Sequence, residues 1–428
     1  MTEQEIAGLG PAFAGYLGRY RDCFLQKRTR THFDTYCRGL LSALPRKSVE
    51  PIALESGTAV RTLQEFLVTA RWDQERARTQ LQTDLAAAVA AMPPDSLGTV
   101  GVIDETSCQK WGDHTPGVQR QYLGCVGKVE NGIVTVHVGV SKGRFQALLD
   151  ADLYLPQAWD ADRERCRAAG IPDDVHYRPK WRIALDQLVR LSGNGLSFDW
   201  LVFDEGYGAA VPFLRILSLI GQRFVAEVPV NFMVRKRLAG VARRADKRLT
   251  AANAKAGRRY RLVHQTVTHS VWRAVDATVW VAGQKQRLIV AINEATAEVK
   301  YFLTNATTEP LARVLAVAFR RWTVEHSFRL GKQEAGLMHY EGRDYLGLTR
   351  HLVLALVVLG FVVTHTERLR GEKSADHRRA SVSGAQPALR DDFPPPSGCS
   401  GDTPHQQNHL LPPTPEPASN AVPQETAA

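Results

Sequence analysis

The segment 320–332 contains charged residues whose types and spacing suit the binding of a metal ion together with a phosphate. Arg321, Glu325 and Lys332 fall on one flank of a predicted helix. Four apolar residues would face a core, namely Phe319, Trp322, Phe328 and Leu330. The same charge pattern is typical of an ordinary ladder of surface ion pairs. The helix alone leaves both interpretations open, and the choice depends on carboxylates from other segments.

Two further acids stand at the ends of apolar, β-prone runs. Asp104 follows the run 99–103, and Asp204 follows the run 200–203. The order of predicted strands and helices favours a mixed α/β sheet in which these two strands are parallel neighbours. Because ligand sites in such sheets gather at the carboxyl ends of the strands, we expect Asp104 and Asp204 side by side. A helix packed across that edge would bring in Glu325.

Three carboxylates in this arrangement suit phosphodiester chemistry. Two Mg²⁺ ions about 4 Å apart activate a nucleophilic oxygen and stabilise the leaving 3′-oxygen, and carboxylate oxygens are ligands that Mg²⁺ prefers. Arg321 and Lys332 would then hold phosphates on either side of the scissile bond. Composition alone leaves an alternative open, since the chain has 44 acidic residues. In that alternative Asp104 is a turn residue and Glu325 an ion-pair partner.

Charge and hydropathy point to a nucleic-acid partner. The 428 residues carry a formal net charge of +10, which favours a polyanion; membrane headgroups are the other class. The longest apolar run, 352–363, is too short to span a bilayer and predicts a buried helix. The N-terminus has no apolar signal core, and the six cysteines show no CxxC pair. We therefore expect a cytoplasmic protein with reduced thiols and no membrane contact.

Residues 1–95 are predicted to form a helical DNA-binding region. Within it, the spacing of Ala53, Gly57 and Leu63 suits a helix-turn-helix, with Arg61 and Gln64 on the helix that would contact bases. A plain helical hairpin fits the same pattern equally well.

Segment 98–232 is predicted to be the first part of the α/β core. Its β-prone runs 119–129 and 133–140 are separated by Glu130-Asn131-Gly132, a signal for a tight hairpin turn.

Segment 233–304 is predicted to be a basic, β-rich insertion. Between 235 and 261 it has eleven Lys or Arg residues and one acid, Asp246. Such density is typical of a solvated surface, and in a basic chain it also suits a track for DNA phosphates. The residues proposed to contact phosphates are Arg235, Lys236, Arg237, Arg243 and Arg244.

The core is predicted to resume over 305–370 with the Glu325 helix. Segment 371–428 contains ten of the 22 prolines and is predicted to be a disordered tail.

Together these motifs resemble the DDE transposases of bacterial insertion sequences, and most closely the insertion-sequence-four-like superfamily in the branch typified by insertion sequence 701. The resemblance extends over about 15–365. The motifs that carry it are Val102-Ile-Asp104-Glu-Thr106, Gln119-Arg-Gln-Tyr-Leu-Gly-Cys-Val-Gly-Lys128, Phe203-Asp204-Glu-Gly-Tyr-Gly208, Arg321-Trp-Thr-Val-Glu325 with Lys332, and Gly336-Leu-Met-His-Tyr340-Glu-Gly-Arg343.

The resemblance implies an RNase H-like core, interrupted by a β-rich insertion between the second Asp and the Glu. It implies that Asp104, Asp204 and Glu325 bind two Mg²⁺ ions, for which Mn²⁺ substitutes. The family signature is Tyr-x2-Arg-x3-Glu-x6-Lys, and Ala318 stands at its Tyr position. Glu105, beside the first Asp, should point to the opposite face of its strand and is not expected to be a ligand.

The resemblance also implies a function: excision and insertion of a DNA element by cleavage and strand transfer. The partners would be terminal inverted repeats and target DNA, bound by a homodimer near the nucleoid. Two rival functions are a metal-dependent endonuclease without strand transfer and a catalytically decayed DNA-binding protein.

Overall fold

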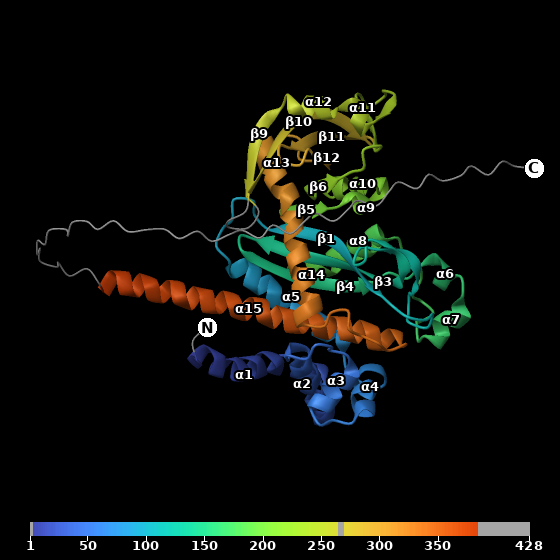
Figure 1. Cartoon of the computed structure of the whole chain (residues 1–428), viewed down its shortest axis with the longest axis vertical. Helices are drawn as coiled ribbons and strands as arrows, with labels where there is room; N and C mark the ends of the chain where they lie inside the picture. Colours follow the sequence, from blue (N-terminus) through green and yellow to red (C-terminus); the bar gives the residue numbers. More distant parts are fainter. Residues whose placement is uncertain (1–2, 264–268, 384–428) are drawn as a thin grey trace, which may run out of the picture. The chain divides into compact units, whose positions relative to one another are not determined.

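The first part of the chain forms six helical segments that lead into a large mixed sheet (Figure 1). The structure, a computed structural model, describes residues 3–263 and 269–383. The N-terminal segments are α1 (Glu3–Gly18), η1 (Arg21–Cys23), α2 (Lys27–Leu41), α3 (Val49–Glu55), α4 (Val60–Val68) and α5 (Gln74–Ala91).

Helices α3 and α4 occupy the predicted helix-turn-helix. Ala53 and Leu63 are fully buried, and Gly57 has a φ of +65° in the turn between the two helices. A positive φ favours glycine, which explains the spacing found in the sequence. Arg61 and Gln64 lie on the exposed side of α4, where Arg61 pairs with Glu65 at 2.8 Å.

Within the described residues, twelve strands join in one sheet. Its order is β2-β3-β1-β5-β6-β12-β11-β10-β7-β8, with β4 paired to β3 and β9 paired to β10. The strands are β1 (Val100–Gln109), β2 (Gln119–Leu123), β3 (Lys128–Lys142), β4 (Phe145–Leu153), β5 (Trp200–Phe203), β6 (Phe224–Glu227), β7 (Met233–Arg235), β8 (Ala242–Arg244), β9 (Arg258–Val263), β10 (His269–Val281), β11 (Gln284–Asn293) and β12 (Val299–Thr304). The mixed α/β class predicted from the sequence is confirmed.

The β-rich segment 233–304 extends the same sheet beyond β6. Strand β12 pairs antiparallel with β6, with Leu303 opposite Ala226. Helices α11 (Ala245–Arg248) and α12 (Ala251–Lys255) lie between β8 and β9 in the chain. Strands β7 and β8 carry Arg235, Arg243 and Arg244 to the end of the strand order farthest from β1.

The predicted turn at Asn131-Gly132 is wrong, because β3 runs through both residues and the β2–β3 turn lies at 124–127. Gly127 adopts a φ of +68° there. Gly132 is needed for a different reason, since a Cβ at this position would come within 2.4 Å of the Cys108 carbonyl oxygen. Tertiary packing of β3 against β1, rather than turn geometry, therefore accounts for this glycine.

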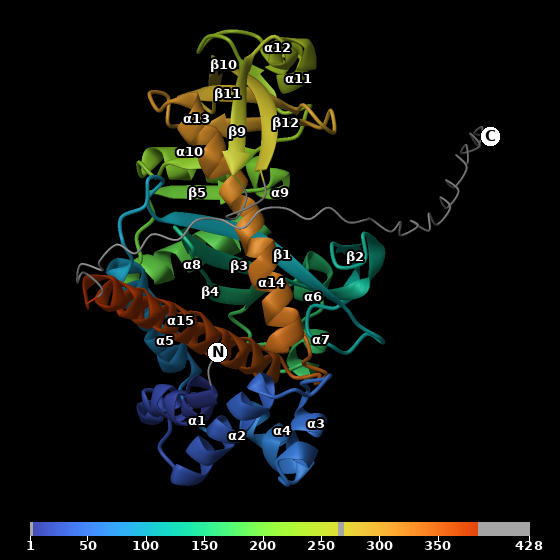
Figure 2. The same cartoon turned by 60° about the vertical axis from the view of Figure 1, so that its left-hand side comes forward.

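Helices cover both faces of the β3–β4 part of the sheet (Figure 2). On one face, the Phe328 ring of α14 (Trp322–Glu334) lies 5.0 Å from the His137 ring. On the other, Arg190 of α8 (Lys180–Gly193) contacts Asp150 of β4 at 2.7 Å. The remaining helices around the sheet are α6 (Gln157–Asp160), α7 (Arg163–Ala168), α9 (Glu205–Gly208), α10 (Val211–Leu219), α13 (Leu311–Ala318) and the 3₁₀ turn η2 (Phe319–Arg321).

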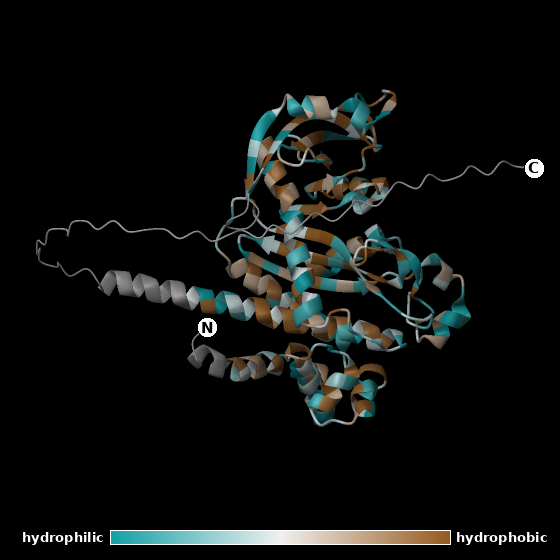
Figure 3. Cartoon of the chain, in the orientation of Figure 1, coloured by the Kyte–Doolittle hydropathy of each residue, from teal (hydrophilic) through white to brown (hydrophobic). Residues whose placement is uncertain are grey.

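The last helix, α15 (Tyr345–Ser383), begins as a hydrophobic helix and becomes polar (Figure 3). Its segment Tyr345–Gly371 is long and apolar enough to cross a bilayer, yet 83% of its most apolar window is buried inside the fold, as is typical of a core helix. The predicted tail boundary at 371 falls inside this helix, because the first proline of that segment comes only at Pro387. Residues 384–428 lie outside the described residues.

Candidate functional site

The register of two parallel strands brings Asp104 and Asp204 to the same edge. The last aligned residues of β1 and β5 are Ile103 and Phe203, so Asp104 and Asp204 are the residues that directly follow this pairing. The parallel pairing predicted from the sequence is confirmed. The prediction that β1 ends at Asp104 is wrong, since β1 continues to Gln109 while paired with β3. Asp104 therefore lies in mid-strand, where β1 is still paired with β3 but no longer with β5.

Asp104 is buried and bonded to a cation. Its side chain shares a sheet face with His137, its cross-strand partner on the face covered by α14. One carboxylate oxygen accepts from the Glu105 backbone N–H at 2.8 Å, and the other accepts from Arg321 Nη1 at 3.0 Å. Burial raises the pKa of Asp104 to about 7 in the metal-free chain, and Arg321 opposes the shift. A buried carboxylate of this kind requires a positive partner.

Glu105 points the other way, as predicted. Its carboxylate pairs with Lys180 of α8 at 2.7 Å, on the opposite face of the sheet from α14. The alternation of side chains along β1 explains this, because successive residues of a strand face opposite sides.

Asp204 is oriented by the helix that it caps. Its Oδ1 accepts from the backbone N–H groups of Gly206 at 3.0 Å and Tyr207 at 3.3 Å, at the start of α9. Helix α9 packs so closely on the end of β6 that a Cβ at Gly208 would lie 1.9 Å from the Glu227 carbonyl oxygen. The glycine therefore allows the short helix, and with it Asp204, to sit at this edge.

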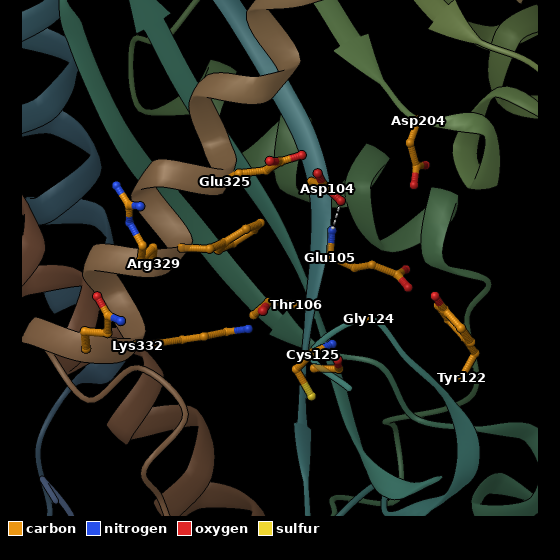
Figure 4. A pocket seen from close by; sticks show the side chains of 13 residues that line it. Asp104, Glu105, Thr106, Tyr122, Gly124, Cys125, Asp204, Glu325, Arg329 and Lys332 are labelled. Carbon is orange, nitrogen blue, oxygen red and sulfur yellow. Dashed lines mark hydrogen bonds between the residues drawn. The ribbon is translucent and has the colours of Figure 1, made fainter. Parts of the chain in front are cut away.

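Glu325 projects from α14 into the same pocket. The pocket has a volume of about 470 Å³ and is lined by Asp104, Glu105, Thr106, Ser107, Tyr122, Gly124, Cys125, Asp204, Glu325, Phe328, Arg329, Lys332 and Gln333. In Figure 4 the Glu325 carboxylate points toward Asp104, and Asp204 lies beyond Asp104. The Glu325 side chain is 63% exposed. All three predicted acids, and Lys332, thus line one pocket.

Asp104, Asp204 and Glu325 are not arranged as a complete metal site in this structure. Within residues 3–263 and 269–383, no group of three His, Cys, Asp or Glu side chains is arranged to hold a metal ion. Instead, the guanidinium of Arg321 lies 3.0 Å from Asp104 and 4.0 Å from Glu325. Against the effect of burial, Asp104 raises the pKa of Arg321. Arg321 thus contacts the carboxylates and is not among the residues that line the pocket. From the sequence we expected it to hold a phosphate there.

The sequence interpretation missed a fourth acid, Glu227. Ala226 is aligned with Phe203 in the parallel β5–β6 pair, so Glu227 follows Ala226 just as Asp204 follows Phe203. Its carboxylate pairs with Lys300 at 2.6 Å and lies 4.0 Å from Arg321. The sequence contained a signal for Glu227, because this acid directly follows the β-prone run 224–226.

The other predicted DNA contacts lie outside the pocket lining. Arg235, Lys236, Arg237 and Arg243 are exposed in and around β7 and β8. Arg244, also exposed, pairs with Asp246 at 2.7 Å. Ala318, at the position of the signature Tyr, is buried at the end of α13.

A family comparison agrees with this geometry. The model of the DDE superfamily endonucleases matches residues 19–288, more than half of the chain. This chain belongs to the DDE superfamily endonucleases. The match includes Asp104 and Asp204 and ends before α14. The resemblance to DDE proteins inferred from the motifs is therefore confirmed.

Among curated proteins, this DDE chain is similar to one described as a probable transposase for insertion sequence element IS701, from Microchaete diplosiphon. The two are 33% identical over 222 residues, which is 51% of this chain and 54% of the relative. The match thus spans about half the length of that relative. A solved structure, the NurA nuclease from Sulfolobus solfataricus, aligns with 58% of this chain and 81% of its own at 8% identity and a TM-score of 0.24.

Proposed function

We propose that this chain is a DNA transposase that cleaves DNA at the ends of an insertion sequence and transfers the freed strand to a target. The observation that supports this most is the register of β1 and β5, which makes Asp104 and Asp204 neighbours in a pocket that Glu325 and Lys332 also line. The partial alignment with a probable transposase supports the same class of reaction.

The core would be RNase H-like. Support comes from the strand order β4-β3-β1-β5-β6, in which β3 is antiparallel to β1 while β5 and β6 are parallel to it. The β-rich segment 233–304 would be the insertion between Asp204 and Glu325. Helices α3 and α4 would recognise terminal inverted repeats through Arg61 and Gln64. Two chains would hold both element ends, which predicts a homodimer in the DNA complex.

Asp104, Asp204 and Glu325 would hold two Mg²⁺ ions, or Mn²⁺ in their place, because hard carboxylate oxygens suit both ions. When bound, such ions activate the attacking oxygen and stabilise the leaving 3′-oxygen. The buried Asp104 carboxylate and the half-exposed Asp204 are ready donors, whereas Glu325 would have to approach them. Arg321 would then be released from Asp104 toward a phosphate, and Lys332 would hold a second phosphate in the pocket.

A strand-transfer assay tests this proposal. It supplies a pre-cut element end with a free 3′-hydroxyl, target DNA and Mg²⁺. Joined donor–target product is the expected result. Cleavage without joined product would instead favour an endonuclease, and binding to element ends without any reaction would favour a decayed DNA-binding protein.

Neutralising part of the basic segment is expected to reduce the salt dependence of DNA binding. Replacing Arg235, Lys236 and Arg237 with glutamine removes three exposed charges. If all three contact phosphates, the slope of log K against log salt should become shallower by about 2–3 units. The measurement is fluorescence anisotropy of labelled end DNA between low and moderate salt.

The matched control replaces Arg167 and Arg215, two exposed arginines on α7 and α10, with glutamine. Their loss should leave the slope nearly unchanged. An equal change of slope per charge in both variants would show that the 235–237 cations act only through net charge, as a solvated surface would.

A further inference from the structure

The candidate active-site pocket has two walls, and one of them contains none of the three acids. One wall is α14, which contributes Glu325, Arg329 and Lys332. The other contains Tyr122 and the β2–β3 turn at Gly124 and Cys125. In Figure 4 the Tyr122 ring lies across the pocket from Arg329 and Lys332. A strand passing through the pocket would therefore run between cations and an aromatic ring.

Tyr122 belongs to an exposed face of the β2–β3 hairpin. Its side chain is 61% exposed, and its cross-strand partner Val129 is 53% exposed. Two residues away on the same face stand the exposed Arg120 and its cross-strand partner Asn131. A basic residue next to an aromatic one on a strand face suits contact with a phosphate and its neighbouring base.

Asn131 also holds the loop that carries a second exposed aromatic residue. Its amide nitrogen donates to the carbonyl oxygens of Lys110 at 2.8 Å and Gly112 at 2.7 Å, on either side of Trp111. Trp111 is 88% exposed. In the part of the chain that the structure describes, Trp111 and Tyr122 are the exposed residues among the Phe, Tyr and Trp side chains.

Hydrogen bonds tether the hairpin that carries Tyr122 and the loop that carries Trp111. The Cys125 N–H donates to Ser107 Oγ at 3.1 Å, which ties the turn to β1, and Gln121 Nε2 donates to the Gly132 carbonyl oxygen at 2.9 Å. Arg165 of α7 donates to the Asp113 carbonyl oxygen at 2.7 Å and so holds the Trp111 loop. Exposed rings on a tethered frame are preorganised for a flat ligand, because little ordering is needed on binding.

We propose that Tyr122 forms a stacking platform for an unpaired base next to the phosphate that reacts in the pocket. The platform rests on the proposed DNA transposase function and adds to it a preference for locally unpaired DNA. The argument for DNA, rather than another protein, is continuity: the platform borders the pocket that holds the three acids, with Arg120 on one side and Lys332 across from it. Every nucleobase offers a π-face, so such a platform would tolerate any sequence.

The test measures the affinity for two DNA ends, one fully paired and one with a mismatch beside the scissile phosphate. It uses the full chain carrying Asp204→Asn, so that the DNA is bound without being cut. We expect this protein to bind the mismatched end about tenfold more tightly than the paired end, the effect of about one stacked base. Adding Tyr122→Ala should remove this preference, whereas Tyr122→Phe should retain it. 2-Aminopurine at the mismatch should be quenched only when the ring is present.

Val189→Ala, at a 66% exposed position of α8, is the matched surface control, and circular dichroism checks the fold of each variant. An unchanged mismatch preference in Tyr122→Ala, with normal binding of end DNA, overturns the platform alone. The platform also fails if Tyr122→Ala loses dimerisation in light scattering while the mismatch preference persists, which would assign the face to a second copy. Failure of the unmutated chain to bind any end DNA overturns the platform and the transposase proposal together.

Discussion

Replacing Asp204 with asparagine is expected to reduce DNA cleavage and strand transfer by about a thousandfold. The loss follows from removing one carboxylate ligand, because bound metal ions supply several kcal/mol of transition-state stabilisation and about 1.4 kcal/mol corresponds to a factor of ten. The fold should tolerate the change. Asparagine caps helices about as well as aspartate, so its amide oxygen can still accept from the N–H groups of Gly206 and Tyr207.

Rates are measured on an oligonucleotide carrying one element end with Mg²⁺, and DNA affinity is measured on the same substrate. The control is Glu205→Gln, which removes an exposed neighbouring charge. Glu325→Gln should lose activity to a similar extent, and calorimetry should show weakened Mg²⁺ binding for both active-site variants. Activity of Asp204→Asn within tenfold of the unmutated chain would exclude Asp204 as a metal ligand.

Replacing Asp150 with alanine is expected to lower the free energy of unfolding by about 3–5 kcal/mol, the usual cost of removing one partner from a buried ion pair. Asp150 is fully buried on β4, 2.7 Å from Arg190 and 3.6 Å from Arg78. The Arg78 side chain is only 6% exposed, so it cannot regain water without moving α5. Burial raises the pKa of Asp150, and the charges of Arg78 and Arg190 oppose this shift.

This cluster connects α5 of the N-terminal helices with the sheet that carries Asp104. Asp152 is the fourth member of the cluster, so two aspartates balance two arginines. Burial alone would raise the pKa of Asp152, but Arg78 and Arg190 lower it. Urea denaturation of the full chain measures the loss. Asp174→Ala, at an exposed site, should change the free energy by less than about 0.5 kcal/mol. A loss below about 1 kcal/mol for Asp150→Ala would mean that water reaches Arg78 and replaces its partner.

The sequence determined the two strands that lead to Asp104 and Asp204, their parallel pairing, and the helix with Glu325 and Lys332. These features follow from local patterns: apolar β-prone runs, a helical segment between two strands, and charges at helical spacing. The motif resemblance to DDE proteins likewise depended only on residue types and their separations.

Only the tertiary structure decided which residues actually meet. Glu227 joins the row of acids because of the β5–β6 register, and Asn131-Gly132 lies within β3 because Gly132 must pass close to Cys108. Arg321 contacts Asp104 because a buried carboxylate needs a nearby cation. Tyr122 comes to the wall of the pocket through the pairing of β2 with β3. Local patterns specify elements, whereas register and burial depend on contacts between residues far apart in the chain.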